Sequence, residues 1–166
     1  MTFREKLLLP LELKKLERIA NRLTRQVGIK AKVGNDFQAL ANDNLIFFAL
    51  LENELDANSF YLDILQKFPF LEDYDIEPFV FSFLHEMGHC VTNTQENMDD
   101  LILRYSLHEM EDRATANRLY FQLPAETSAT NWGVTYAMCH LEEITKWQNQ
   151  MLRAYQKFFK KFQIEA

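Results

Sequence analysis

The chain has 166 residues, of which 48% are hydrophobic and 25% are charged, and its formal net charge is −6. This length and apolar content are enough for one domain with its own core, and the acidic balance argues against direct nucleic-acid binding as its main function. Glycine and proline are scarce, at 4 residues each, which favours long helices over a turn-rich all-β fold.

The sequence gives no sign of a membrane or secreted protein. No apolar stretch approaches the ~18 residues needed to span a bilayer, and the first residues lack a cleavable signal pattern. Two cysteines do not make a disulfide framework. We therefore expect a cytoplasmic protein with no membrane partner.

The first elements expected are a helix, two short strands and a second helix. Apolar residues at three- and four-residue steps predict an amphipathic helix over residues 10–27, ended by Gly28. Alternating apolar and basic residues predict a strand over 29–33, and the apolar run 44–51 predicts a second strand paired with the first. Residues 59–67 are expected to form the next helix.

A buried helix is expected after an acidic, aromatic loop at residues 69–75. Pro78 suits the first turn of a helix, and Asp75 and Glu77 suit its positive end. The run of Phe, Val and Leu that follows predicts a helix that is buried on most of its circumference.

Within this helix, residues 85–89 carry the pattern H-E-x-x-H. His85 and His89 are four positions apart and therefore project from the same helix face, where two imidazoles can bind one zinc ion. Glu86 is then placed to reach a water in the open coordination position. The alternative is a buried helix whose histidines bond only to neighbouring groups, which would leave costly buried polar groups.

Two further residues of this helix bear on the site. Gly88 costs about 1 kcal/mol of helix propensity relative to alanine, and a small residue here would let another backbone approach closely. The side chain of Cys90 points about 100° away from His89 on a helix, so a zinc–thiolate bond is not expected.

The second half of the chain is expected to be helical. The polar stretch 92–97 predicts a loop, followed by a helix over residues 101–123 that ends at Pro124. A last helix is expected over residues 134–162, because its apolar and aromatic residues recur at helical steps.

A catalytic zinc site needs a third protein ligand, and the candidates lie on the helix 101–123. Glu111 lies at the edge of one apolar stripe, whereas Asp112 and His108 belong to a second stripe. Periodicity therefore does not choose between Glu111 and Asp112. His108 is expected to be a surface histidine, with a hydrogen bond to a metal ligand as the alternative. His140 is expected to be structural, with oxyanion stabilisation as the alternative if the last helix crosses the cleft.

Residues 111–124, with the sequence EDRATANRLYFQLP, resemble the second signature of the ImmA/IrrE family of zinc metallopeptidases. That family carries H-E-x-x-H on one helix and, on the next, a glutamate followed by an alanine three residues later and a proline thirteen residues later. Glu111, Ala114 and Pro124 match this spacing. The resemblance implies Glu111 as the third zinc ligand, with Asp112 as the alternative.

The resemblance implies a single zincin-like metallopeptidase domain over residues 1–166. Its fold would be α+β and mostly helical, with a small N-terminal β-sheet and a helical metal-binding half. The implied activity is zinc-dependent peptide hydrolysis with Glu86 as general base, in an intracellular regulatory protease that cuts a protein such as a repressor. One alternative is a zincin-fold binding module with a structural metal or none, and another is a zinc enzyme acting on a non-peptide amide.

Overall fold

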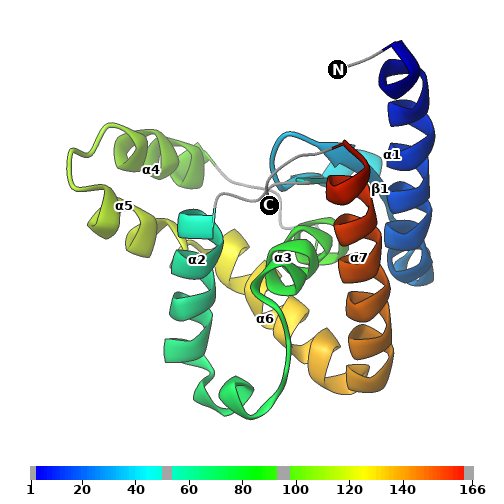
Figure 1. Ribbon diagram of the computed structural model, residues 1–166. Coiled ribbons are helices and arrows are strands. Elements are labelled where there is room, and N and C mark those ends of the chain that lie inside the picture. Colours follow the sequence, from blue (N-terminus) through cyan, green and yellow to red (C-terminus); the bar gives the residue numbers. More distant parts are fainter. Residues whose placement is uncertain (1–2, 50–53, 93–97, 163–166) are drawn as a thin grey trace.

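The computed structural model describes residues 3–49, 54–92 and 98–162, and it is mostly helical with one small three-stranded sheet (Figure 1). This confirms the expected α+β, mostly helical architecture with the sheet near the N-terminus. No helix among the described residues is long and apolar enough to cross a membrane.

The N-terminal helix α1 (Phe3–Thr24) continues into a 3₁₀ turn, Arg25–Val27. Gly28 follows in the left-handed conformation, with φ of 77°, and its N–H bonds to the Arg25 carbonyl. The prediction of Gly28 as the stop is confirmed, because glycine adopts this conformation at little cost. Pro10 lies inside α1 rather than at its start, so the helix begins earlier than expected.

The sheet contains β1 (Lys30–Gly34), β2 (Gln38–Leu40) and β3 (Leu45–Ala49) in the order β1-β3-β2. The two predicted strands are confirmed, and they pair with each other in parallel. Leu50 and Leu51 of the predicted second strand lie outside the described residues. The short strand β2 was not predicted, and it pairs with β3 in antiparallel fashion at the edge of the sheet.

Helix α2 (Glu54–Lys67) begins earlier than the predicted residues 59–67 and is followed by a 3₁₀ segment, Pro69–Asp73, where a loop was expected. Helix α3 (Pro78–Thr92) begins at Pro78 as predicted. Most of its residues are buried, as the apolar run indicated. Residues 93–97 of the predicted loop lie outside the described residues.

The single helix predicted over 101–123 is wrong. The structure has α4 (Met98–His108), a break, and then α5 (Arg113–Tyr120). Asp112 causes part of this break, because its side chain accepts hydrogen bonds from the backbone N–H and the hydroxyl of Thr115. A carboxylate bonded in this way caps the start of α5.

The single helix predicted over 134–162 is also wrong. Pro124 does not end a helix but begins α6 (Pro124–Cys139), and α7 (Leu141–Phe162) follows after a break at His140. Proline suits this first helical position because its missing N–H has no partner there. The apolar stripe of α7 faces the core, as expected from its periodicity, with buried residues Ile144, Trp147, Met151 and Phe158.

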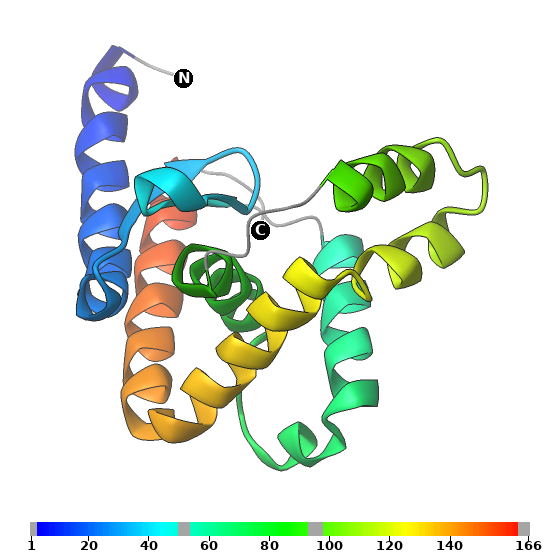
Figure 2. The same cartoon turned by 180° about the vertical axis from the view of Figure 1, so that it is seen from behind.

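Helices α3 and α6 pack closely against each other, and two glycines make this possible. A Cβ atom on Gly88 would lie 2.3 Å from the carbonyl oxygen of Ala129, and one on Gly133 would lie 3.2 Å from atoms of Leu84. The expectation that Gly88 admits a neighbouring backbone is therefore confirmed. Figures 1 and 2 show α3 and α6 in the middle, α1 and α7 at one end, and α4 and α5 at the other.

Candidate metal centre

The two histidines of the motif lie side by side on α3, at the face covered by α6. Their Nε2 atoms are 3.1 Å apart. His85 is buried and His89 is half-buried. One helical turn separates them, so the spacing in the sequence produces this proximity directly.

The third member of the cluster is Glu126, in the first turn of α6. Its Oε2 atom lies 2.9 Å from Nε2 of His85 and 3.2 Å from Nε2 of His89. The residue is fully buried, with 0% exposure. A carboxylate in such a place needs strong partners, since an ionised group without them is very costly to bury.

The three donor atoms suit a metal ion. Their separations of 2.9–3.2 Å compare with roughly 3.3 Å between ligands of a tetrahedral zinc ion with bonds of 2.0–2.1 Å. Two imidazole nitrogens and one carboxylate oxygen are also a donor set of catalytic zinc sites, which leave one position open. The residues present therefore fit a zinc ion with shifts of a few tenths of an ångström.

Thr130, one turn beyond Glu126 on α6, orients the first histidine. Nδ1 of His85 lies 3.0 Å from Oγ1 of Thr130. When Nδ1–H donates to this oxygen and Nε2 gives up its own proton, the Nε2 lone pair points to the space shared with Glu126 and His89, which is the form that a metal requires. The aromatic rings of Phe60 and Phe121 contact the His85 ring in edge-to-face geometry, with centroids 5.1 and 6.2 Å away, and restrict its rotation.

Electrostatics favour the charged forms of Glu126 and His89. Burial by itself would raise the pKa of Glu126, but hydrogen bonds from His85 and His89 outweigh this effect and hold the pKa well below its usual range. Burial likewise opposes charge on His89, yet the hydrogen bond and negative charge of Glu126 raise the net pKa of His89. Glu126 and His89 therefore stabilise each other in charged, hydrogen-bonded form.

Glu86 lies next to this cluster without being part of it. Burial raises its pKa and the negative charge of Glu126 adds to this rise, while His85, His89 and a hydrogen bond from the Ala39 backbone N–H oppose it. The net pKa is above the ordinary glutamate value. A carboxylate with a raised pKa holds a transferred proton better than an ordinary one does.

The structure does not bring the predicted third ligands to the histidines. Glu111 and Asp112 are both exposed in the break between α4 and α5, and Asp112 caps α5. The prediction of Glu111, with Asp112 as alternative, rested on the spacing of the ImmA/IrrE signature along a helix expected over residues 101–123. Because that helix is interrupted, the carboxylate that meets the histidines is instead Glu126.

The two other histidines also lie apart from the cluster. His108 ends α4 and is exposed. His140 follows the last turn of α6, 14 positions after Glu126, which is about 21 Å along a helix axis. An oxyanion role for His140 at this site is therefore excluded by distance.

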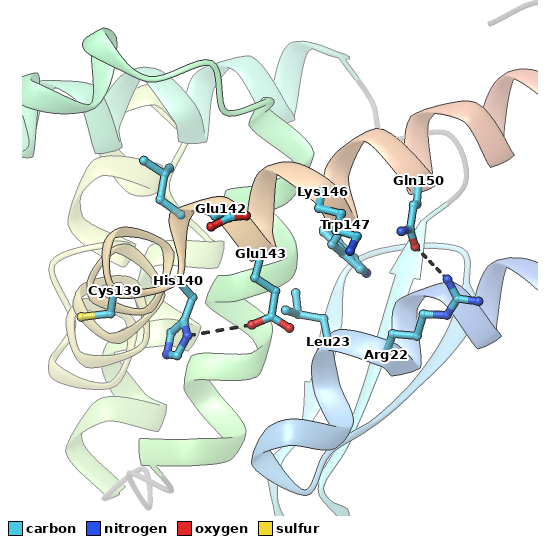
Figure 3. A pocket seen from close by; sticks show the side chains of 10 residues that line it. Arg22, Leu23, Cys139, His140, Glu142, Glu143, Lys146, Trp147 and Gln150 are labelled. Atoms are coloured by element: carbon cyan, nitrogen blue, oxygen red, sulfur yellow. Dashed lines mark hydrogen bonds and ion pairs between the residues drawn. The ribbon is translucent and has the colours of Figure 1, made fainter.

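His140 instead lines a separate surface pocket of about 620 Å³ where α1, α6 and α7 meet (Figure 3). Its ring stacks on Tyr136, with centroids 4.4 Å apart, and its Nδ1 lies 3.9 Å from a carboxylate oxygen of Glu143. These contacts fit the structural role that was expected.

Cys90 also stays outside the cluster, as expected. Its thiol is buried and lies 3.8 Å from the Leu45 carbonyl oxygen, to which it donates. Burial and the charge of Glu86 raise the pKa of the thiol to about 11, so it is protonated at neutral pH.

Sequence reasoning missed Glu126, although one local signal points to it. Pro124 followed two residues later by an acidic residue is typical of a helix start as well as of a helix end. Interpreted as a helix start, this pattern predicts that Glu126 lies in the first turn of a helix. It would not have placed that turn beside the histidines.

Comparison with models of protein families, with characterised proteins and with solved structures finds no match to this chain.

Proposed function

We propose that the chain is a zinc-dependent peptidase with a zincin-like site. The observation that carries this proposal is the convergence of His85, His89 and Glu126, whose donor atoms lie within 3.2 Å of one another. Glu86 stands beside them on the same helix as the two histidines. This arrangement is the one expected if H-E-x-x-H acts as a metal-binding motif.

In this proposal the two histidines and Glu126 hold the metal through two nitrogens and one carboxylate oxygen. Zinc, when bound, supplies a Lewis acid that polarises the scissile carbonyl and acidifies the attacking water. Glu86 accepts a proton from that water as its oxygen bonds to the carbonyl carbon. Glu86 then gives this proton to the amide nitrogen as the carbon–nitrogen bond breaks, so the products are a carboxyl group and an amine.

The partner in this proposal is a protein or peptide substrate. The proposal of an intracellular regulatory protease that cuts a repressor-like protein rests on the H-E-x-x-H motif that the chain shares with the ImmA/IrrE family, because Glu111 of the second signature does not reach the histidines. The net charge of −6 gives no support to direct nucleic-acid binding.

A second candidate is a binding module that keeps this fold and uses no metal. The observation in its favour is that the cluster is internally satisfied, because Glu126 bonds to both histidines and also to Arg104. A buried polar network of this kind can stabilise a core by itself.

Metal analysis separates the two candidates. The purified wild-type protein should contain close to one zinc ion per chain, and His89→Ala and Glu126→Gln should lose it. Glu111→Gln is the matched control, since it makes the same chemical change at an exposed glutamate, and it should keep the metal. A wild-type protein that binds no zinc when supplied with it, or a Glu126→Gln variant with full zinc content, contradicts the proposed site.

Glu86→Gln tests the chemistry. The amide keeps the size of the side chain but accepts no proton, so the variant should retain zinc and lose hydrolysis by ~10²-fold or more. Co-expression with repressor-like proteins encoded beside it, scored by cleavage, is the first assay. If the wild type and Glu86→Gln alter such a partner equally and neither cuts it, the binding-module candidate is favoured.

A further inference from the structure

Helices α4 and α5 form a hairpin at the end of the molecule opposite α1 and α7 (Figures 1 and 2). Their main contacts are with each other rather than with the central helices. The hairpin nevertheless reaches the metal centre through two side chains, Arg104 from α4 and Tyr120 from α5.

Both side chains act on the same carboxylate. Nη2 of Arg104 donates a hydrogen bond to Oε1 of Glu126, the oxygen that does not face the histidines. The Arg104 guanidinium stacks over the Tyr120 ring at 4.9 Å from its centroid. Burial raises the pKa of the Tyr120 hydroxyl, and the negative charge of Glu126 adds to this rise.

The two carboxylate oxygens of Glu126 therefore have separate partners. Oε2 faces Nε2 of both histidines, and Oε1 is occupied by the hairpin. A glutamate ligand without such a partner can rotate about its last bond and offer both oxygens to a metal. A guanidinium on one oxygen removes this freedom, because its planar N–H groups fix the plane of the carboxylate as well as its charge.

We propose that Arg104 is a positioning residue of the metal centre, which holds Oε1 of Glu126 so that Oε2 alone faces the metal, with Tyr120 supporting the guanidinium. This inference rests on the proposed function, since it assigns a role to Arg104 only if the cluster binds metal. It makes the α4–α5 hairpin part of the site, although none of its described side chains belongs to the metal-binding cluster.

The test compares Arg104→Met, Arg104→Lys and the control Arg118→Met, which removes an exposed arginine of the same hairpin. Zinc affinity is measured by competition with a chromophoric chelator, and the visible spectrum of the Co²⁺-substituted protein reports the coordination. Loss of an outer-shell partner commonly lowers metal affinity 10–100-fold, which is the loss expected for Arg104→Met. Arg104→Lys keeps the charge without the planar group and should fall between Arg104→Met and the wild type, and Arg118→Met should match the wild type.

The cobalt spectrum distinguishes positioning from general stability. If Glu126 rotates and offers both oxygens to the metal, the visible absorption bands of Co²⁺ change in position and intensity in the Arg104 variants. If the substitution only makes the protein less stable, the Co²⁺-bound variant keeps the wild-type spectrum. Wild-type zinc affinity and an unchanged spectrum in Arg104→Lys overturn the proposal, even if Arg104→Met does not fold. A wild-type protein that binds neither Zn²⁺ nor Co²⁺ overturns the proposed function itself, so the two failures are distinguishable.

Discussion

Replacing Gly88 by alanine tests whether the close crossing of α3 and α6 builds the metal centre. The new Cβ would lie 2.3 Å from the carbonyl oxygen of Ala129 and 2.8 Å from its Cα and carbonyl carbon. A comfortable carbon–oxygen contact is roughly 3.3 Å, so the helices must separate by about 1 Å. All three atoms belong to the backbone of α6, and no side-chain rotation can relieve the clash.

Two opposing terms set the size of the effect on stability. Overpacking in a close-packed interior lowers the free energy of unfolding by about 1–3 kcal/mol, and alanine in place of glycine within a helix raises it by about 1 kcal/mol. We expect a net loss of about 1–2 kcal/mol in the free energy of unfolding, measured by urea denaturation of the metal-free protein. Zinc affinity should fall more clearly, because a shift of about 1 Å exceeds the ±0.2 Å within which metal–ligand distances are held.

Gly133→Ala is the matched control, since it adds the same methyl group to the other side of the same crossing. Its nearest contacts, with atoms of Leu84, would be at 3.2 Å, which small adjustments relieve. The free energy of unfolding of this variant should remain within about 1 kcal/mol of the wild-type value, because the gain in helix propensity offsets a mild clash. If Gly88→Ala is as stable as Gly133→Ala and binds zinc equally well, the crossing does not set the geometry of the site.

Three further outcomes are expected. Thr130→Val removes the acceptor 3.0 Å from Nδ1 of His85 and should weaken zinc binding 10–100-fold in a chelator competition, whereas wild-type affinity would refute an orienting role. Iodoacetamide at pH 7.5 should label the exposed Cys139 and spare Cys90. The Cys90 thiol is buried with a pKa of about 11, so it should become reactive only as the pH rises towards that value. Labelling of both cysteines at the same rate, measured by peptide mass spectrometry, would contradict this expectation. Asp112→Ala should lower the free energy of unfolding by about 1 kcal/mol, because α5 loses its cap, and should leave the zinc content unchanged. Loss of zinc from this variant would instead indicate that Asp112 is a metal ligand.

The sequence predicted those parts of the fold that depend on the backbone preferences of single residues and on helix periodicity. Gly28 ends α1 because a left-handed residue is needed there, and Pro78 begins α3 because the first turn tolerates proline. The histidine pair follows from helix periodicity alone. Gly88, which lies between the two histidines, predicts a close approach by another backbone because it has no side chain, and α6 makes this approach.

Local signals did not predict Glu126 as the third member of the cluster. A break of four residues between α4 and α5 is set by the cap at Asp112, and such a break is hard to separate from a continuous helix by apolar periodicity. Pro124 was predicted to end a helix, whereas it begins helix α6. Which carboxylate meets the histidines depends on how α6 crosses α3, and this crossing is a tertiary contact made possible by Gly88 and Gly133.

The crossing also sets the electrostatics of the site before any metal binds. Glu126 lies in the first turn of α6, at the positive end of that helix, and His89 lies in the last turn of α3, at the negative end of its helix. The start of α6 therefore favours the anion at Glu126, and the end of α3 favours positive charge, which is carried by His89 before a metal binds and by the metal afterwards. Arg104 supplies a further positive partner for Glu126 from a third helix. A buried carboxylate that is held by two histidines, an arginine and a helix end stays ionised in place, so zinc would meet a site that is already formed.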